Sequence, residues 1–368
     1  MSTRYVVIGA GAVGALLAAQ LELAGIPVVL VARGVHLALI RGQGLTIHRP
    51  DSIDTVRPRA VDGPAGVHLT PDDVLVLAVK AQDADAALAE WAWQPVAGGG
   101  VTADLPILTF QNGMDTEALA LRRFARVYGV TIAVAASYLT PGAVVSPSYP
   151  RIGVVWIGRY PDRADPAADG FAEDLRRAGY GARSVPDITA WKARKLLGNV
   201  RNGLDLLAGS APDKARAGEL LTAEASAVFA AEGIVPAEPL SGLVVRPVPG
   251  HTPGRLSTWQ SHARGASSET DHLNGEIVLR GRRLGVPTPV NARLQRLVGT
   301  SWSSGTTYPV GELLTVIDDG PPGGTRGEDG PSTGDTTTGS PSAGSPAPDA
   351  ARNGAGPAAG GAEVRISA

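Results

Sequence analysis

A glycine-rich turn near the N-terminus constrains the fold of this chain more than any other feature. Residues 5–8 (YVVI) are typical of a short buried strand, and an apolar helical pattern continues through residues 16–19 (LLAA). Between them Gly9, Gly11 and Gly14 have the spacing G-x-G-x-x-G. In dinucleotide-binding folds the first glycine permits a tight turn, the second admits a pyrophosphate and the third allows close packing of helix on strand. The stretch therefore predicts a strand–turn–helix unit that binds a dinucleotide.

The phosphate site of such a unit is made by the backbone. Unpaired N–H groups at the start of the helix, here including those of Ala12 and Val13, point at the phosphates, and the helix dipole favours their negative charge. A lone G-x-G-x-x-G motif is weak evidence, because chains rich in alanine and glycine produce it by chance. A glycine-rich packing contact between strand and helix is the alternative interpretation.

The composition excludes several classes of protein. A chain of 368 residues is long enough for two domains, and its net charge of −2 gives no electrostatic reason to expect nucleic acid or a membrane surface as a partner. No cysteine is present, and the six histidines never occur as H-x-x-x-H or H-x-H, so we expect no metal site. No window of about 20 apolar residues is free of charge. We expect a cytoplasmic enzyme.

Strand and helix patterns alternate along the first half of the chain and then give way to helices. Apolar runs typical of parallel strands covered on both faces occur at residues 26–32, 73–79, 105–110 and 127–133. Residues 138–157 indicate an antiparallel addition at the sheet edge. Only helical patterns follow, at residues 189–207, 214–233, 255–264, 267–284 and 291–298.

These patterns predict two domains and a tail. Residues 1–185 are predicted to form an α/β Rossmann-type domain that binds the cofactor, and residues 186–305 an all-α domain. Residues 318–368 consist mostly of Gly, Pro, Ser, Thr, Ala and Asp. They cannot bury enough apolar surface to offset the entropy lost on ordering, so we expect them to be disordered.

Three polar residues stand where predicted strands end, at the edge where open α/β sheets bind ligands. Arg33 occupies the position at which an NAD-binding fold has an acidic residue for the ribose 2′-hydroxyl, so a 2′-phosphate and hence NADP is favoured. Lys80 follows one buried strand, and Asn112 follows the next in an Asn-Gly turn. The simpler alternatives are a solvated arginine, a solvated lysine and a plain turn.

The predicted helical domain contains two further polar groups of residues. Lys195 and Asn199 are four residues apart and share one helix face, with Asn202 near it. Glu269 belongs to a polar helix start at residues 267–275. A solvated helix face and ordinary helix capping also explain these patterns, and nothing in the sequence alone joins the two segments in space.

In the order of these motifs the chain resembles the ketopantoate reductase (2-dehydropantoate 2-reductase) family, from about residue 4 to residue 300. The counterparts are the glycine turn, Lys80, the Gln111-Asn112-Gly113-Met114 loop, Lys195-x-x-x-Asn199, and the run from Ser257 through Glu269 to Gly275. The resemblance implies a C-terminal domain with helices like those of 6-phosphogluconate dehydrogenase. It also implies NADPH as cofactor, a small 2-oxo acid as substrate, ketopantoate first, and a homodimer as one option.

The resemblance also implies roles for the residues at the reacting centre. Lys195 would be the general acid that protonates the C2 oxygen of the substrate, and Glu269 would position that lysine by a hydrogen bond. Asn112 would hold the substrate near the nicotinamide, and Lys80 would lie at the same end. Arg33 matches the arginine that binds the 2′-phosphate.

The substrate end departs from the family pattern. Asn199 and Ser257 would bind the hydroxyl and carboxylate groups of the substrate. Family members often have a second substrate-binding asparagine where this chain has Gly203, and Asn202 one residue earlier is the candidate replacement. Asp115 stands where the family often has glycine. A reductase of a different 2-oxo or β-oxo acid is therefore one alternative. A non-catalytic NADP-binding sensor is the other, although a sensor needs no general acid.

Overall fold

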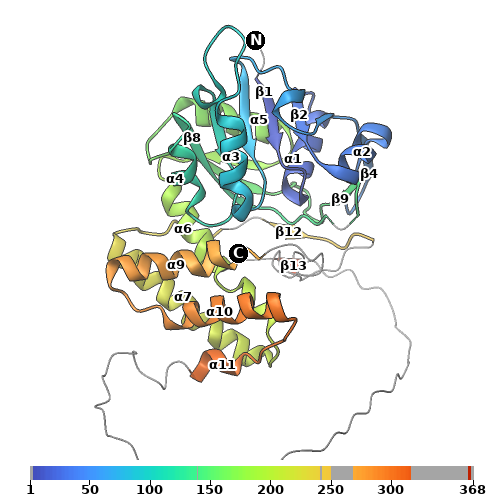
Figure 1. Cartoon of the computed structure of the whole chain (residues 1–368). Coiled ribbons are helices and arrows are strands. Elements are labelled where there is room, and N and C mark those ends of the chain that lie inside the picture. The colour runs from blue at the N-terminus through green and yellow to red at the C-terminus, as the bar shows by residue number, and fades with distance from the viewer. Residues whose placement is uncertain (1–2, 139, 241–242, 250–267, 316–363, 366–368) are drawn as a thin grey trace, which may run out of the picture.

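The chain forms an α/β domain and a helical domain that lie one above the other in Figure 1. The structure, a computed structural model, describes residues 3–138, 140–240, 243–249, 268–315 and 364–365. No helix in these ranges is long and apolar enough to cross a membrane. The predicted fold class, an α/β domain followed by helices, is confirmed.

An eight-stranded sheet forms the centre of the α/β domain, in the order β11-β10-β8-β7-β6-β1-β2-β5. Its strands are β1 (Arg4–Ile8), β2 (Val28–Val31), β5 (Arg59–Val61), β6 (Asp73–Leu77), β7 (Pro106–Thr109), β8 (Arg126–Ala133), β10 (Val154–Tyr160) and β11 (Gly181–Ser184). Neighbouring strands are parallel except β8 and β10. Because β1 lies between β2 and β6, the strand order reverses there, and open sheets bind ligands at such a switch point.

Both faces of this sheet are buried, as the all-apolar strands predict. Within β1, Tyr5 and Val7 join one apolar cluster while Val6 and Ile8 join another on the opposite face. The helices that complete these clusters are α1 (Ala12–Leu23) and α5 (Pro166–Arg177) on one face, and α3 (Ala84–Ala92) and α4 (Thr116–Leu121) on the other. The helix α2 (Gly34–Gln43) follows β2.

The helical domain packs around a core of its own, to which Leu196, Phe229, Ile277 and Leu294 contribute. Its helices are α6 (Ile188–Asn199), α7 (Ala211–Glu232), α9 (Thr270–Leu284), α10 (Pro289–Ser304) and the short α11 (Gly311–Leu314). The first of them, α6, contacts β8 and β10 and so joins this domain to the sheet.

A buried polar network fixes the ends of two of these helices, α6 and α10. Asn274 on α9 donates to the carbonyl oxygen of Val200 (2.8 Å) and to Oδ1 of Asn291 (2.9 Å). The carboxylate of Glu224 on α7 accepts from Nδ2 of Asn291 (2.7 Å) and from the backbone N–H groups of Val290 and Asn291 at the start of α10. These bonds satisfy groups that helix ends leave unpaired.

The helix predicted over residues 189–207 is wrong in its second half. α6 ends at Asn199, and the 3₁₀ helix η4 (Asn202–Leu206) follows, with the N–H group of Leu204 bonded to the carbonyl of Arg201. The side chain of Asn274 takes the Val200 carbonyl that a continuous α-helix would use. The break follows from this tertiary hydrogen bond.

The predicted antiparallel addition at residues 138–157 is correct only for β10, which pairs antiparallel with β8. The preceding strand β9 (Ala143–Val145) pairs parallel with β3 (Leu45–His48), which also pairs with β4 (Ile53–Val56) in a separate three-stranded sheet. Strand β11 lies outside β10 at the sheet edge and is not predicted from the sequence. Its four residues, GARS, include no apolar run.

Most of the predicted tail, and the helix predicted at residues 255–264 together with Ser257, lie outside the described residues. Within the tail, Val364–Arg365 form strand β13, antiparallel to β12 (Val244–Val245). The prediction of disorder is therefore wrong for these two residues. Val364 is β-branched and favours a strand, and the partner β12 offers a backbone edge.

Candidate active site

The glycine turn after β1 has a backbone geometry that only glycine adopts readily. Gly9 has a φ angle of 109°, and a Cβ atom there would lie 2.8 Å from the backbone nitrogen of Val79. A Cβ atom on Gly14 would collide with the carbonyl oxygen of Gly9. Both glycines are thus required by the close approach of β1, α1 and the end of β6.

The start of α1 is open to a ligand. Gly11 is exposed, and a Cβ atom on it would meet nothing within 4 Å. The first bond of the helix runs from the N–H group of Ala15 to Gly11, so the N–H groups of Ala12, Val13 and Gly14 lack intrahelical partners. Free donors and open space at a helix N-terminus fit a pyrophosphate group.

Arg33 lies at the end of β2, where it precedes α2. Its side chain is 75% exposed and forms a 3.0 Å ion pair with Glu90 of α3. An exposed pair of this kind contributes roughly 0–1 kcal/mol, so a phosphate can displace the carboxylate at small cost.

Lys80 and Glu269 connect the two domains. Lys80 follows β6, and its Nζ donates to Oε2 of Glu269, which precedes α9 and has a side chain only 5% exposed. Among the described residues the structure pairs Glu269 with Lys80, which reaches across from the strand end, and not with Lys195 as expected. Glu269 lies at the predicted site but holds a different lysine.

Lys195 is partly buried on α6, and burial lowers the pKa of its ammonium group to about 8. Its side chain has no hydrogen-bond partner among the described residues. One turn later, Asn199 is 7% exposed, and its Nδ2 likewise finds no partner within the described part of the chain. A buried donor without a partner is unusual in a folded protein, and a ligand oxygen would satisfy it.

Asn202 begins η4 and is also 7% exposed. A Cβ atom on the next residue, Gly203, would lie 3.2 Å from Val298 and 3.3 Å from Leu294. A side chain at position 203 would therefore point at the apolar core of the helical domain. Asn202 is the polar residue nearest in sequence to position 203, where the family often has an asparagine.

The loop that carries Asn112 is held from both domains. On one side Gln111 donates through Nε2 to the carbonyl oxygens of Leu77 and Val79 at the end of β6, at 2.9 Å each. On the other side Gly113, with a φ angle of 90°, lies so close to α9 that a Cβ atom would be 2.7 Å from the carbonyl oxygen of His272. Asn112 itself is partly buried between these anchors.

Asp115, three residues after Asn112, makes a contact between the domains. Its Oδ2 lies 2.6 Å from Nδ1 of His272 on α9, and this hydrogen bond raises the pKa of His272. Asp115 thus contacts the helical domain at a position where the family often has glycine.

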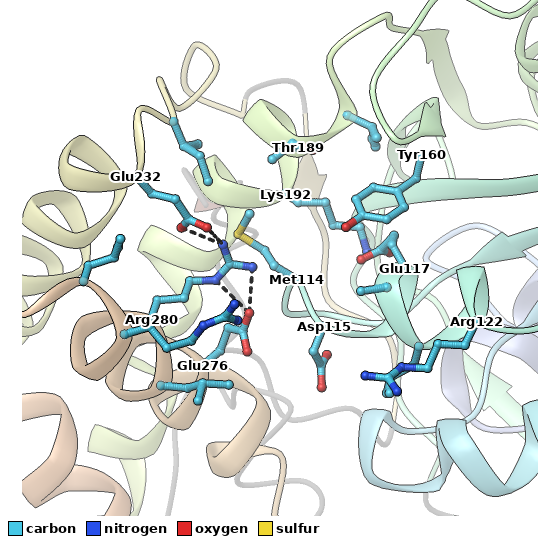
Figure 2. A pocket seen from close by; sticks show the side chains of 17 residues that line it. Met114, Asp115, Glu117, Arg122, Tyr160, Thr189, Lys192, Glu232, Glu276 and Arg280 are labelled. Atoms are coloured by element: carbon cyan, nitrogen blue, oxygen red, sulfur yellow. Dashed lines mark hydrogen bonds and ion pairs between the residues drawn. The ribbon is translucent and has the colours of Figure 1, made fainter.

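A buried ion pair adjoins these residues. Nζ of Lys192 on α6 lies 2.6 Å from Oε1 of Glu117 on α4, and the two side chains are 4% and 3% exposed. Both residues line a cavity of about 650 Å³ between the domains (Figure 2). None of the described site residues predicted from the sequence lines this cavity. The sequence alone assigns Glu117 no role.

Comparisons with known proteins agree with this architecture. The family described as "Ketopantoate reductase PanE/ApbA" matches residues 5–162, and its C-terminal counterpart matches residues 187–301. A protein from Mycobacterium tuberculosis H37Rv named 2-dehydropantoate 2-reductase is 31% identical over 318 residues, covering 82% of this chain and 98% of its own length. One of the same name from Archaeoglobus fulgidus is 29% identical over 307 residues, covering 80% and 96%.

Solved structures share the fold. A PanE/ApbA family ketopantoate reductase from Ralstonia eutropha JMP134 has a TM-score of 0.66 at 24% identity, covering 82% of this chain and 98% of its own. A ternary structure of D-mandelate dehydrogenase with NADH and anilino(oxo)acetate has a TM-score of 0.68 at 22% identity, covering 82% and 99%. The family matches to both domains, together with the relative that shares 31% identity, show that the chain belongs to the ketopantoate reductase family.

Proposed function

We propose that this protein reduces a small 2-oxo acid with NADPH, and that the substrate is 2-dehydropantoate, as the names of its curated relatives suggest. One observation carries the chemistry. Lys195, with its pKa lowered to about 8, lies one helical turn from the unpaired amide of Asn199. A proton donor and a free hydrogen-bond donor together suit a carbonyl that becomes an alcohol.

The residues of α6 would stabilise and protonate the reacting oxygen. NADPH, when bound, supplies the hydride, and hydride addition places negative charge on the C2 oxygen of the substrate. The ammonium group of Lys195 would stabilise that charge and donate the proton. Such proton transfer accelerates reactions roughly 10²–10⁴-fold, and it works best when the pKa of the acid lies near the working pH.

The cofactor would lie across the switch point of the sheet. The open backbone at Gly11 and the free N–H groups of residues 12–14 would hold the pyrophosphate, and Arg33 would bind the 2′-phosphate in exchange for Glu90. Lys80, oriented by Glu269, would lie at the nicotinamide end. In this proposal Glu269 positions Lys80 and not Lys195.

The substrate would be held between Asn112 of the α/β domain and the amides of Asn199 and Asn202 in the helical domain. A different 2-oxo or β-oxo acid is the second candidate. It is favoured by the departures at the substrate end, where Gly203 faces the apolar core and Asp115 is bound to His272. A cytoplasmic location, with a homodimer as the assembly to test by light scattering, belongs to the same proposal.

A substrate panel tests the function. Purified protein is mixed with NADPH and a series of 2-oxo acids, and the loss of nicotinamide absorbance is followed. The proposal predicts that kcat/KM is highest for 2-dehydropantoate. If the protein reduces only another acid of the panel, that acid replaces 2-dehydropantoate as the substrate. Tight NADPH binding without any turnover would leave the sensor interpretation.

A further inference from the structure

We propose that Lys192 and Glu117 are a positioning pair, which fixes the loop that carries Asn112 against the helix that carries Lys195. The two side chains touch no predicted cofactor or substrate residue directly, so they would act through their neighbours. The kinetic test of this pair rests on the proposed function. A second measurement, hydrogen exchange, does not depend on activity.

One ammonium group joins three elements. Nζ of Lys192, on α6, lies 2.6 Å from the carboxylate of Glu117 on α4 and donates to the carbonyl oxygen of Gln111 at 2.8 Å. Oε1 of Glu117 also accepts from the hydroxyl of Thr109 at the end of β7 (2.6 Å), and that hydroxyl contacts the carbonyl oxygen of Tyr128 on β8 (3.3 Å). A chain of buried polar contacts thus runs from the sheet to α6.

The pair adjoins both halves of the proposed site. Gln111 precedes Asn112 directly, and its side chain is bonded to the end of β6 just before Lys80. Lys192 lies three residues before Lys195 on the same helix. Any change in the contact between Lys192 and the Gln111 carbonyl therefore changes where the Asn112 loop stands relative to Lys195.

Stability alone does not explain a buried ion pair at this place. Desolvation of two charges offsets much of their attraction, and well-packed apolar residues of similar size are often as stabilising or more so. Apolar side chains, however, cannot donate a hydrogen bond to the Gln111 carbonyl. The pair does what a packed apolar core does not, because it fixes the register between a loop and a helix that belong to different domains.

Three variants separate positioning from stability. Lys192→Met and Glu117→Gln each break the pair, and the double variant Lys192→Met/Glu117→Leu replaces it with apolar residues. We expect each single variant to lower kcat at least about 10-fold while the Kd for NADPH changes less than about twofold, since small misplacements cost much in rate. We expect the double variant to recover the melting temperature but not kcat.

The control breaks another ion pair of the same cavity. Arg280 on α9 binds Glu232 and Glu276, within the helical domain, and among the described residues it makes no hydrogen bond or ion pair with the Asn112 loop. Arg280→Met should lower the melting temperature and leave kcat within about twofold of wild type. A large loss of kcat in this control would mean that kcat follows stability, and the proposal would be overturned.

Hydrogen exchange gives the readout that is independent of activity. Backbone amides of residues 110–115 should exchange faster in the double variant than in wild type, because the Gln111 carbonyl loses its anchor. Unchanged exchange there, or a double variant with the kcat of wild type, would overturn the positioning role. If wild type reduces no 2-oxo acid, the proposed function fails, and hydrogen exchange still decides whether the pair holds the loop.

Discussion

Three lysines of this protein differ in whether they are paired with a carboxylate, and this difference decides which of them can act as an acid. Lys80 is paired with Glu269 across the domains, and Lys192 is paired with Glu117 in the interior. Lys195 has neither partner among the described residues, and burial lowers its pKa to about 8. Only an ammonium group that is not committed to a carboxylate is available to give its proton to a substrate.

The pKa of Lys195 predicts a pH dependence. The general acid has to be protonated, so kcat/KM for the reduction should be constant below pH 8 and fall as the pH rises through about 8. Steady-state kinetics from about pH 6 to about pH 10 would measure this limb. A profile that stays flat to the upper end of that range would show that Lys195 is not the acid.

The exposed guanidinium of Arg33 predicts cofactor preference. Arg33→Ala should weaken NADPH binding about 10- to 100-fold through loss of a charge-assisted hydrogen bond, and should leave NADH binding almost unchanged. Fluorescence titration with both cofactors measures the difference. Glu90→Gln, which frees Arg33 from its ion pair, is the matched control and should not weaken NADPH. Equal losses for NADPH and NADH in Arg33→Ala would remove the 2′-phosphate assignment.

At the scale of elements, sequence patterns predict those strands and turns whose structure depends on residues adjacent in the sequence. Parallel strands such as β1 and β6 were predictable because each is an apolar run buried on both faces, and the glycine turn because its backbone admits only glycine at Gly9 and Gly14. The end of α6 at Asn199 was not predictable, since it depends on Asn274, some 70 residues later in the chain. Strand β9 likewise pairs with β3, about 100 residues earlier.

The network that ends α6 predicts a stability effect. Asn274→Ala removes hydrogen bonds to Val200 and Asn291 and leaves their buried acceptors unpaired, so the free energy of unfolding should fall by about 2–4 kcal/mol. Urea unfolding would measure it. Gln295→Ala removes an exposed bond to Asp271 and should change that free energy by less than about 0.5 kcal/mol. Similar losses in both variants would mean that the network is not what holds α6 and α9 together.

At the scale of the whole molecule, the proposed site exists only where the domains meet. The candidate cofactor residues belong to the sheet edge, Lys195 and Asn199 belong to α6, and Glu269 reaches Lys80 from α9. The sequence supplied most of these residues through motif order and family resemblance. It predicted neither the contact of Glu269 with Lys80 nor a role for Glu117, because contacts between domains leave no periodic signal in either segment.

In the proposed reaction the hydride donor and the proton donor come from different domains and meet at one carbonyl. The most direct test is the reduction of 2-dehydropantoate by Lys195→Ala in a stopped-flow assay at saturating NADPH, with NADPH binding measured alongside. We expect the rate of the chemical step to fall at least about 10²-fold while the Kd for NADPH changes less than about twofold. A variant that reduces the substrate at a rate near wild type would contradict this proposal.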